Sequence, residues 1–310
     1  MASERSIGVG LVGAGPWSER FLAPMLARGP ETRLLGIWGR RPGAVNELAQ
    51  RFDARAFPSF EDLVDSCEAV AFCVPPAVQA ELALVATAAG RALLFSKPLA
   101  EDVHSAEQVA RAAEDAGVPT LFGLNWHVHP ATLQFVAASQ QIGVSGCEAS
   151  FLSSAYLAGP FATDWRLRRG VILDIGPHAF DLLELCAGSI TAVHVEGHPL
   201  RFVSILAEHT SGAVSAVLLS ASAGIDPYEA KVRAYGEIGS ASLDCAELDA
   251  TTSMSCLCRL FAALVKGKTS AAGLGVARGL EIQRIIGAAE RSLASGGARE
   301  AVSPCTQGDR

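Results

Sequence analysis

The sequence lacks an excess of positive charge and contains no run of basic residues. Its 25 lysines and arginines are outnumbered by 32 aspartates and glutamates, so the formal net charge is −7. Proteins that bind nucleic acids neutralise phosphates with clustered cations. We therefore expect no nucleic-acid partner for this chain.

Long hydrophobic runs are also missing. The longest one, at residues 212–225, is interrupted by serines and is shorter than the roughly 20 apolar residues of a transmembrane helix. Residues 1–6 carry charges of both signs and lead directly into an apolar segment, which is not the layout of a secretory signal peptide. We expect no membrane partner and a cytoplasmic location.

The cysteines lack the spacing of a structural zinc site. The closest pair, Cys256 and Cys258, forms a C-x-C and not the paired C-x₂-C units that zinc sites use. Others, such as Cys73 and Cys186, stand in apolar contexts, as buried thiols do in a reducing compartment. We expect free cysteines.

Apolar residues are abundant, at 50% of the chain against 18% charged residues. In the first 125 residues, short apolar runs alternate with amphipathic segments of about 10–15 residues, which predicts βαβ units and a parallel sheet. The expected strands lie at residues 7–12, 33–38, 55–57, 69–74, 92–95 and 120–124.

The pattern changes after about residue 130 to alternating strand-like runs, and Thr210-Ser211-Gly212 between two of them predicts a hairpin. Two helices are expected at residues 253–265 and 276–294. The fold class is therefore α/β, with two domains and a short tail. We expect a Rossmann dinucleotide-binding domain at 1–124, an α+β domain with a largely antiparallel open sheet at 125–300, and a polar tail at 301–310.

A glycine motif follows the first expected strand and opens the first expected helix. It reads Gly13-Ala14-Gly15-Pro16-Trp17-Ser18 and fits G-x-G-x-x-G except for Ser18 at the third glycine. Gly13 permits a tight turn, and Gly15 lets backbone amides approach a pyrophosphate at the helix N-terminus. In this context the motif predicts a dinucleotide site, whereas the bare pattern would suit any glycine turn.

The end of the second expected strand indicates which dinucleotide is bound. NAD-binding versions usually place Asp or Glu there to hold the ribose 2′-hydroxyl, but this sequence reads Trp38-Gly39-Arg40-Arg41. Arg40 and Arg41 suit a 2′-phosphate, or they form a solvated turn. We expect NADP(H) to be preferred over NAD(H).

Three later segments carry a resemblance to a known family. They are Phe72-Cys73-Val74-Pro75-Pro76, Leu94-Phe95-Ser96-Lys97-Pro98-Leu99 and Leu173-Asp174-Ile175-Gly176-Pro177-His178. In this order the chain resembles, over nearly its whole length, the Gfo/Idh/MocA oxidoreductases, which include glucose–fructose oxidoreductase, inositol dehydrogenases and sugar ketoreductases. The resemblance implies hydride transfer between NADPH and a carbonyl or secondary alcohol of a sugar, nucleotide sugar or polyol.

The resemblance also implies residue roles. Lys97 matches the catalytic lysine of the family's Glu-Lys-Pro motif, in which a cis bond often precedes the proline. Asp174 and His178 match an Asp-x-x-x-His motif near the reacting carbon. The remaining implied contacts are Trp165 and Arg166 with the substrate, and Pro75, Pro76, Ser96, Lys97 and Asn125 with the cofactor.

The residues support this interpretation independently. Gly13, Arg40, Pro75, Lys97 and Asn125 all fall at carboxyl ends of expected strands, which line the ligand crevice of a doubly wound sheet. A lysine there suits a general acid, although a snorkelling surface lysine is the alternative.

Asp174 and His178 are four residues apart and would share one helix face, so that the acid orients a proton-relaying imidazole. Pro177 implies a helix start or a local break between them. A core histidine with a capping aspartate remains an alternative. His127 and His129, together with Asp174 and His178, could in principle form a metal site. Nicotinamide chemistry needs no metal, so we expect none.

One departure from the family pattern matters for activity: Ser96 replaces the family's glutamate. This keeps open a non-catalytic NADP(H)-binding regulatory or partner protein as the alternative function. A small ketone or imine substrate and a metal-assisted lyase or hydrolase are weaker alternatives. The resemblance further implies a homodimer or homotetramer formed through the open face of the second sheet.

Overall fold

A computed structural model describes residues 5–271 and 273–303 of the chain. Two compact units result: one contains the residues up to Asn125 together with Asp249–Leu280, and the other contains Trp126–Leu248 with the residues from Glu281 onward. Asn125 and residues 249–280, which we expected in the second domain, thus group with the first unit. Most of the expected tail, residues 304–310, lies outside the described residues.

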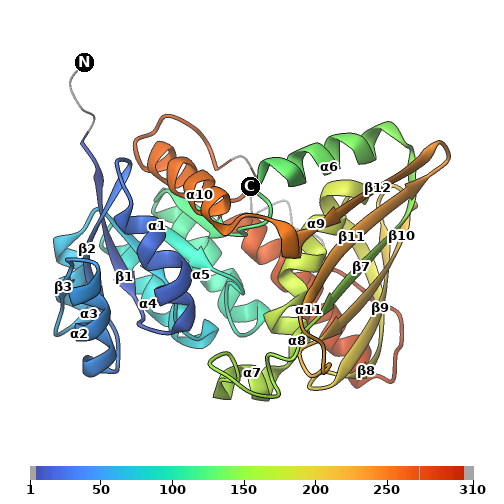
Figure 1. The fold of residues 1–310 in the computed structure, drawn as a ribbon, viewed down its shortest axis with the longest axis horizontal. Coiled ribbons are helices and arrows are strands. Elements are labelled where there is room, and N and C mark those ends of the chain that lie inside the picture. Colours follow the sequence, from blue (N-terminus) through green and yellow to red (C-terminus); the bar gives the residue numbers. More distant parts are fainter. Residues whose placement is uncertain (1–4, 272, 304–310) are drawn as a thin grey trace. The chain divides into compact units, whose positions relative to one another are not determined.

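The first unit is built on a six-stranded parallel sheet with the order β3-β2-β1-β4-β5-β6. This is the order of doubly wound dinucleotide-binding domains, and it confirms the expected Rossmann fold. Figure 1 labels β1, β2 and β3 of this sheet. Val9, Leu11 and Phe72 are fully buried in it. The strands are β1 (Ile7–Val12), β2 (Thr32–Trp38), β3 (Arg55–Ala56), β4 (Ala69–Phe72), β5 (Ala92–Ser96) and β6 (Thr120–Gly123).

The first helix is not a continuous α-helix. A π-helix at Ser18–Leu22 precedes α1 (Ala23–Ala27). Sequence reasoning also missed α3 (Phe60–Ser66), which begins where the Ser59 hydroxyl accepts a hydrogen bond from the Asp62 amide. The other helices of this unit are α2 (Pro42–Arg51), α4 (Pro76–Ala88), α5 (Val103–Asp115) and α10 (Ala250–Val265).

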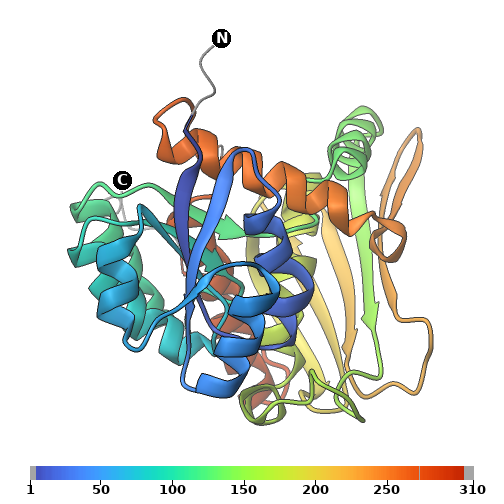
Figure 2. The ribbon, with the colours of Figure 1, turned by 60° about the vertical axis from the view of Figure 1, so that its left-hand side comes forward.

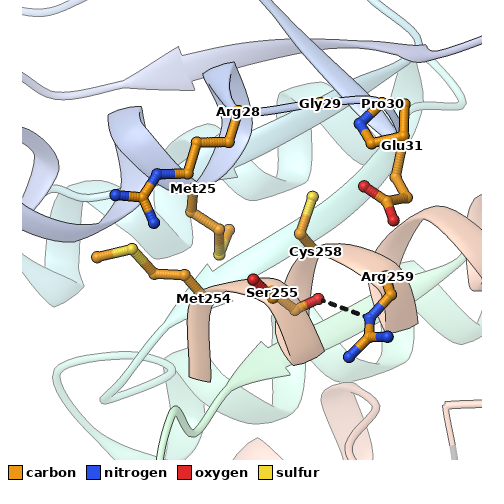
Figure 3. Close-up of a pocket in the computed structure, with 9 residues that line it drawn as sticks. All are labelled: Met25, Arg28, Gly29, Pro30, Glu31, Met254, Ser255, Cys258 and Arg259. Atoms are coloured by element: carbon orange, nitrogen blue, oxygen red, sulfur yellow. Dashed lines mark hydrogen bonds between the residues drawn. The ribbon is translucent and has the colours of Figure 1, made fainter. Parts of the chain in front are cut away.

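Helix α10 belongs to this unit because it packs against α1 and β6 (Figure 2). Thr32 Oγ1 and Cys258 Sγ lie 3.1 Å apart across this packing. A hollow of about 320 Å³ remains beside them (Figure 3). Its lining residues are Met25, Arg28, Gly29, Pro30, Glu31, Met254, Ser255, Cys258 and Arg259.

The second unit contains a seven-stranded sheet with the order β12-β11-β7-β10-β9-β8-β13. Its pairings are antiparallel except for β7 with β10, so the largely antiparallel sheet is confirmed. The strands are β7 (Val144–Leu152), β8 (Ile190–His198), β9 (Phe202–His209), β10 (Val214–Ser220), β11 (Glu229–Gly236), β12 (Gly239–Asp244) and β13 (Glu300–Ala301).

Helices cover one face of this sheet, with α9 packed against β7, β10 and β11. On the covered face, side chains such as Ile205, Val217 and Val232 are fully buried. The helices described here are α6 (Pro130–Gln141), α7 (Asp164–Arg169), α8 (Val171–Asp174), α9 (Gly176–Ala187) and α11 (Val276–Ala294), with a short 3₁₀ turn at Cys245–Glu247.

The opposite face of this sheet exposes large apolar side chains. Phe202, Leu206, Val214 and Leu218 are 43%, 51%, 49% and 38% exposed, and they alternate with buried residues along β9 and β10. We call these four residues the open-face patch. Among residues 5–271 and 273–303, no helix combines the length and apolar character that crossing a bilayer requires.

The expected hairpin at Thr210-Ser211-Gly212 connects β9 to β10 and is stabilised by a buried histidine. Gly212 has a φ of +86°, which glycine adopts without steric cost. His209 Nδ1 lies 2.6 Å from the Gly188 carbonyl, and Nε2 lies 2.7 Å from the Ser215 hydroxyl. Because a carbonyl can only accept, the neutral ring carries its proton on Nδ1.

We predict that His209 makes the stability of the protein pH-dependent. Burial lowers the pKa of His209 below its ordinary value, so below about pH 6.5 the unfolded chain binds more protons than the folded one. The His209 contribution is thus present above that pH and is lost as the pH falls through the depressed pKa. Chemical denaturation between about pH 7.5 and pH 5 should show a smaller loss of stability for His209→Asn than for the wild type. His104→Asn, at an exposed position on α5, is the control, and an equal slope in the His209 variant would contradict the prediction.

Candidate functional site

The glycine turn brings three strand ends of the first unit together. The Gly13 amide donates to the Trp38 carbonyl of β2 at 2.7 Å. Gly13 has a φ of +110°, and a Cβ there would lie 2.3 Å from the carbonyl oxygen of Cys73, just past β4. Only glycine satisfies both the conformation and the close approach.

The start of the first helix leaves room for a ligand. A Cβ at Gly15 would meet no heavy atom within 4 Å, so the backbone is accessible at this point. Pro16 and Trp17 are the first helical residues, and the Trp17 ring stacks on Phe21 with centroids 4.8 Å apart. Ser18 is fully buried, as the small residue at the third position of the motif should be. Open space at a helix N-terminus fits a pyrophosphate.

The two arginines after β2 lie beside this turn. Arg41 Nη2 donates to the Ala14 carbonyl at 3.0 Å. A Cβ at Gly39 would lie 3.6 Å from Gly13 Cα, so this segment runs directly along the turn. Arg40 and Arg41 are both exposed and are therefore accessible to an anionic ligand. The residues present fit a dinucleotide whose phosphates lie at the turn.

The lysine motif lies at the end of β5 in the same unit. The Lys97–Pro98 peptide is cis, as the resemblance implied, and Lys97 is half-buried. Ser96 Oγ donates to the Phe72 carbonyl of β4 at 2.6 Å. Pro75 and Pro76 start α4, and Asn125 is buried just beyond β6.

A buried glutamine of α4 contacts the lysine motif and was not found from the sequence. Gln79 is 1% exposed. Its Oε1 accepts from the Ser96 amide at 3.0 Å, and its Nε2 lies 2.9, 3.0 and 2.9 Å from the carbonyl oxygens of Ser96, Pro98 and Leu99. A lone glutamine in a helical pattern gives no sequence signal for such contacts.

In the second unit, Asp174 ends α8 and Ile175 separates it from α9. Pro177 lies in the first turn of α9, so the structure contains both arrangements that this proline left open, a helix start and a local break. Asp174 Oδ2 accepts from Arg166 Nε at 3.0 Å and from the Tyr156 hydroxyl at 3.2 Å. Burial and the Asp174 charge raise the pKa of Tyr156, so its hydroxyl remains a donor.

Three of the expected substrate residues therefore lie together. The Arg166 guanidinium lies 4.6 Å from the Trp165 ring centroid and bonds Asp174. The fourth, His178, places its ring 4.6 Å from that of Trp126. The orientation of His178 by Asp174 stays a prediction. Tyr156 was missed because its contact joins segments 18 residues apart.

The two histidines considered for a metal have other partners. His127 Nδ1 lies 2.9 Å from Asp181 Oδ2, and Asp181 is 1% exposed. His129 caps α6, with its Nδ1 accepting from the Ala131 amide at 3.1 Å. Within the described ranges, no three His, Cys, Asp or Glu side chains are grouped to hold a metal ion.

Comparisons with known proteins agree with this geometry. Residues 7–124 match the model of the Gfo/Idh/MocA oxidoreductase family with its NAD-binding Rossmann fold. A UDP-N-acetylglucosamine 3-dehydrogenase of Acidithiobacillus ferrooxidans is 28% identical over 186 residues, 59% of this chain and 53% of that protein. A dTDP-3,4-didehydro-2,6-dideoxy-α-D-glucose 3-reductase of Actinomadura kijaniata is 28% identical over 194 residues, 61% and 58% of the two chains. The matched region thus spans little more than half of these curated relatives.

Solved structures resemble the chain over almost all of its length. GenD2 from gentamicin A biosynthesis, in complex with NAD, gives a TM-score of 0.88 at 21% identity and covers 98% of each chain. The WlbA dehydrogenase from Bordetella pertussis, in complex with NADH and UDP-GlcNAcA, gives 0.86 at 19% identity, with 98% and 100% covered. At these identities the likeness shows that the fold is shared.

Proposed function

We propose that this chain transfers a hydride between a nicotinamide cofactor and a carbonyl or secondary alcohol, because residues 7–124 match the Gfo/Idh/MocA oxidoreductase family with its NAD-binding Rossmann fold. The observation that carries the proposal is the edge of the first sheet. There the open backbone at Gly15 and the lysine at the end of β5 follow strands of one parallel sheet. Parallel strands end at a common edge, where such sheets bind their ligands.

Each part of the proposed site has a distinct task. The turn at Gly13 and Gly15 binds the pyrophosphate, and the bound nicotinamide supplies or accepts the hydride. Lys97 donates a proton to the substrate oxygen during reduction and removes it during oxidation. This proton transfer balances the hydride, so that carbonyl and alcohol interconvert with no charge left on oxygen.

The second unit supplies the substrate contacts in this proposal. Asp174 already holds two donors, and Arg166 stacks against an aromatic ring, so both side chains have fixed positions. Such groups suit the hydroxyls of a sugar. His178 binds the same substrate or relays the proton. The names of the two curated relatives support a sugar or nucleotide sugar, and turnover of UDP- and dTDP-linked sugars against free sugars and polyols would define the class.

One observation favours a second function, a non-catalytic NADP(H)-binding regulatory protein. Ser96 replaces the family's glutamate, and its hydroxyl proton is already donated to the Phe72 carbonyl. The two functions differ in one measurement. Transfer of a labelled hydride from NADPH to any carbonyl compound supports the enzyme, whereas cofactor binding without transfer across the sugar panel supports the regulator.

For the cofactor, we predict tighter binding of NADPH than of NADH. Arg40 and Arg41 are exposed beside the turn and suit the 2′-phosphate. In Arg40→Ala/Arg41→Ala, the Kd for NADPH should rise about 10- to 100-fold, while that for NADH changes little. Arg111→Ala, at an exposed position on α5, is the control. Equal wild-type affinities that the double substitution leaves unchanged would contradict the preference.

For the chemistry, we predict that Lys97→Met lowers kcat by about 10²–10⁴-fold, the usual contribution of a general acid. The Kd for NADPH should stay close to the wild-type value, because the cofactor's phosphates are bound at the glycine turn. Lys231→Met, at a half-exposed lysine of β11, should behave as the wild type. A near-normal kcat in Lys97→Met would show that another group is the acid. Loss of NADPH binding would instead assign Lys97 to the cofactor.

For assembly, we propose a homodimer or homotetramer formed through the open-face patch. Burying these exposed apolar side chains in an interface would lower the free energy of the protein in water. Light scattering at micromolar concentration should give a multiple of the 32.2 kDa chain mass. Leu206→Glu/Leu218→Glu should give monomers. Leu133→Glu, on α6 and 56% exposed, is the matched control, and a monomeric wild type would refute the proposal.

A further inference from the structure

We propose that Gln79 is a positioning residue that fixes the backbone around Lys97 and thereby the place of its ammonium group. The inference rests on the proposed function only in giving Lys97 a catalytic task. The contacts themselves lie wholly within the first unit, where α4 carries the glutamine and the end of β5 carries the lysine.

The hydrogen-bond pattern identifies what the side chain does. One amide group contacts the backbone on both sides of Lys97: the amide and carbonyl of Ser96 before it, and the carbonyls of Pro98 and Leu99 after it. The lysine backbone is therefore held from both flanks by a single side chain.

The chemistry of the pattern is specific for an amide. Three of the four partners are carbonyl oxygens, which only accept, and the fourth is an N–H, which only donates. A glutamine offers two N–H donors and one acceptor in the same plane, so one N–H is shared between two of the three carbonyl oxygens. A carboxylate of the same shape offers no donor, and a thioether offers neither. Glutamine at this position is thus matched to the loop and not merely to the space.

The position of Gln79 is itself fixed. Gln79 is 1% exposed. Its backbone N–H donates to the Pro75 carbonyl at 2.9 Å in the first turn of α4. Pro75 and Pro76 set the start of that helix directly after β4. The Gln79 side chain therefore holds the lysine segment at a fixed position relative to the start of α4. This matters for catalysis, because a displacement of about 1 Å in a reacting group lowers the rate by about 10²-fold.

The test uses an observable that does not depend on activity. The chain contains four lysines, Lys97, Lys231, Lys266 and Lys268, so ¹³C-methylation of the amines gives a simple NMR spectrum, in which Lys97→Met assigns the Lys97 signal. In Gln79→Met the Lys97 signal and its titration midpoint should move, and the other three should not. Gln79→Glu, which keeps the shape, serves if the first variant does not fold.

A matched control separates positioning from loss of any buried amide. Gln283 is also 1% exposed, on α11, and its Oε1 has no partner among the described residues. Gln283→Met should leave the Lys97 signal unchanged. An unchanged Lys97 signal in both Gln79 variants, with the wild-type titration midpoint, overturns the proposal.

Kinetics supply the second readout. Gln79→Met should lower kcat about 10²-fold with the Kd for NADPH retained, and should add little in a Lys97→Met background, because the two act as a unit. If Gln79→Met lowers kcat by the same factor in the Lys97→Met background as in the wild type, Gln79 has a general structural role and the proposal is overturned. If wild-type turnover is absent, the proposed function fails, while the NMR comparison still decides the role of Gln79.

Discussion

The turn at Gly13 is the constraint on which the first unit depends. Its backbone lies so close to Cys73 that any Cβ would clash, and its amide bonds the end of β2. The ends of β2, β1 and β4 are therefore fixed relative to one another by backbone contacts. Ser96 extends this series to β5 through the Phe72 carbonyl. Arg41 at one end and Lys97 at the other consequently belong to one continuous hydrogen-bonded edge.

The second unit has a different organising interaction, the nearly buried carboxylate of Asp174. A buried charge is costly unless donors satisfy it, and Arg166 and Tyr156 both do so. The Arg166 guanidinium in turn lies over two aromatic rings, at 4.6 Å from Trp165 and 5.6 Å from Phe161. Removing one member would leave the others unsatisfied, so this cluster behaves as a unit.

Local patterns predicted the elements that local sequence determines. The expected strand at 7–12 and helix at 276–294 coincide with β1 and α11, because each has a continuous apolar run or a sustained helical period. β12 was missed, since Gly239–Asp244 has little apolar alternation and becomes a strand by pairing with β11. α10 was predicted as a helix, but its attachment to the first unit depends on contacts with α1 that no local pattern contains.

The same distinction separates the predicted site residues from the missed ones. The glycine turn, Lys97 and Asp174 belong to contiguous motifs, which a sequence displays directly. Gln79 and Tyr156 act through contacts 17 to 20 and 18 residues away, and only the folded chain brings those segments together. Hydrogen-bond partners that are distant in sequence come together only in the folded chain, so a local sequence pattern does not identify them.

Serine at position 96 changes how the lysine segment is held. A carboxylate has no proton to give and would repel the Phe72 carbonyl, whereas the serine hydroxyl donates to it at 2.6 Å. The serine therefore ties β5 to β4 at the residue before Lys97. Gln79 binds the same residue through its backbone and continues to Leu99. Both contacts are to main-chain atoms, so the geometry around Lys97 does not require a glutamate side chain. What the serine removes is one negative charge beside the lysine, and a cofactor rich in phosphates meets less repulsion at an edge that lacks it.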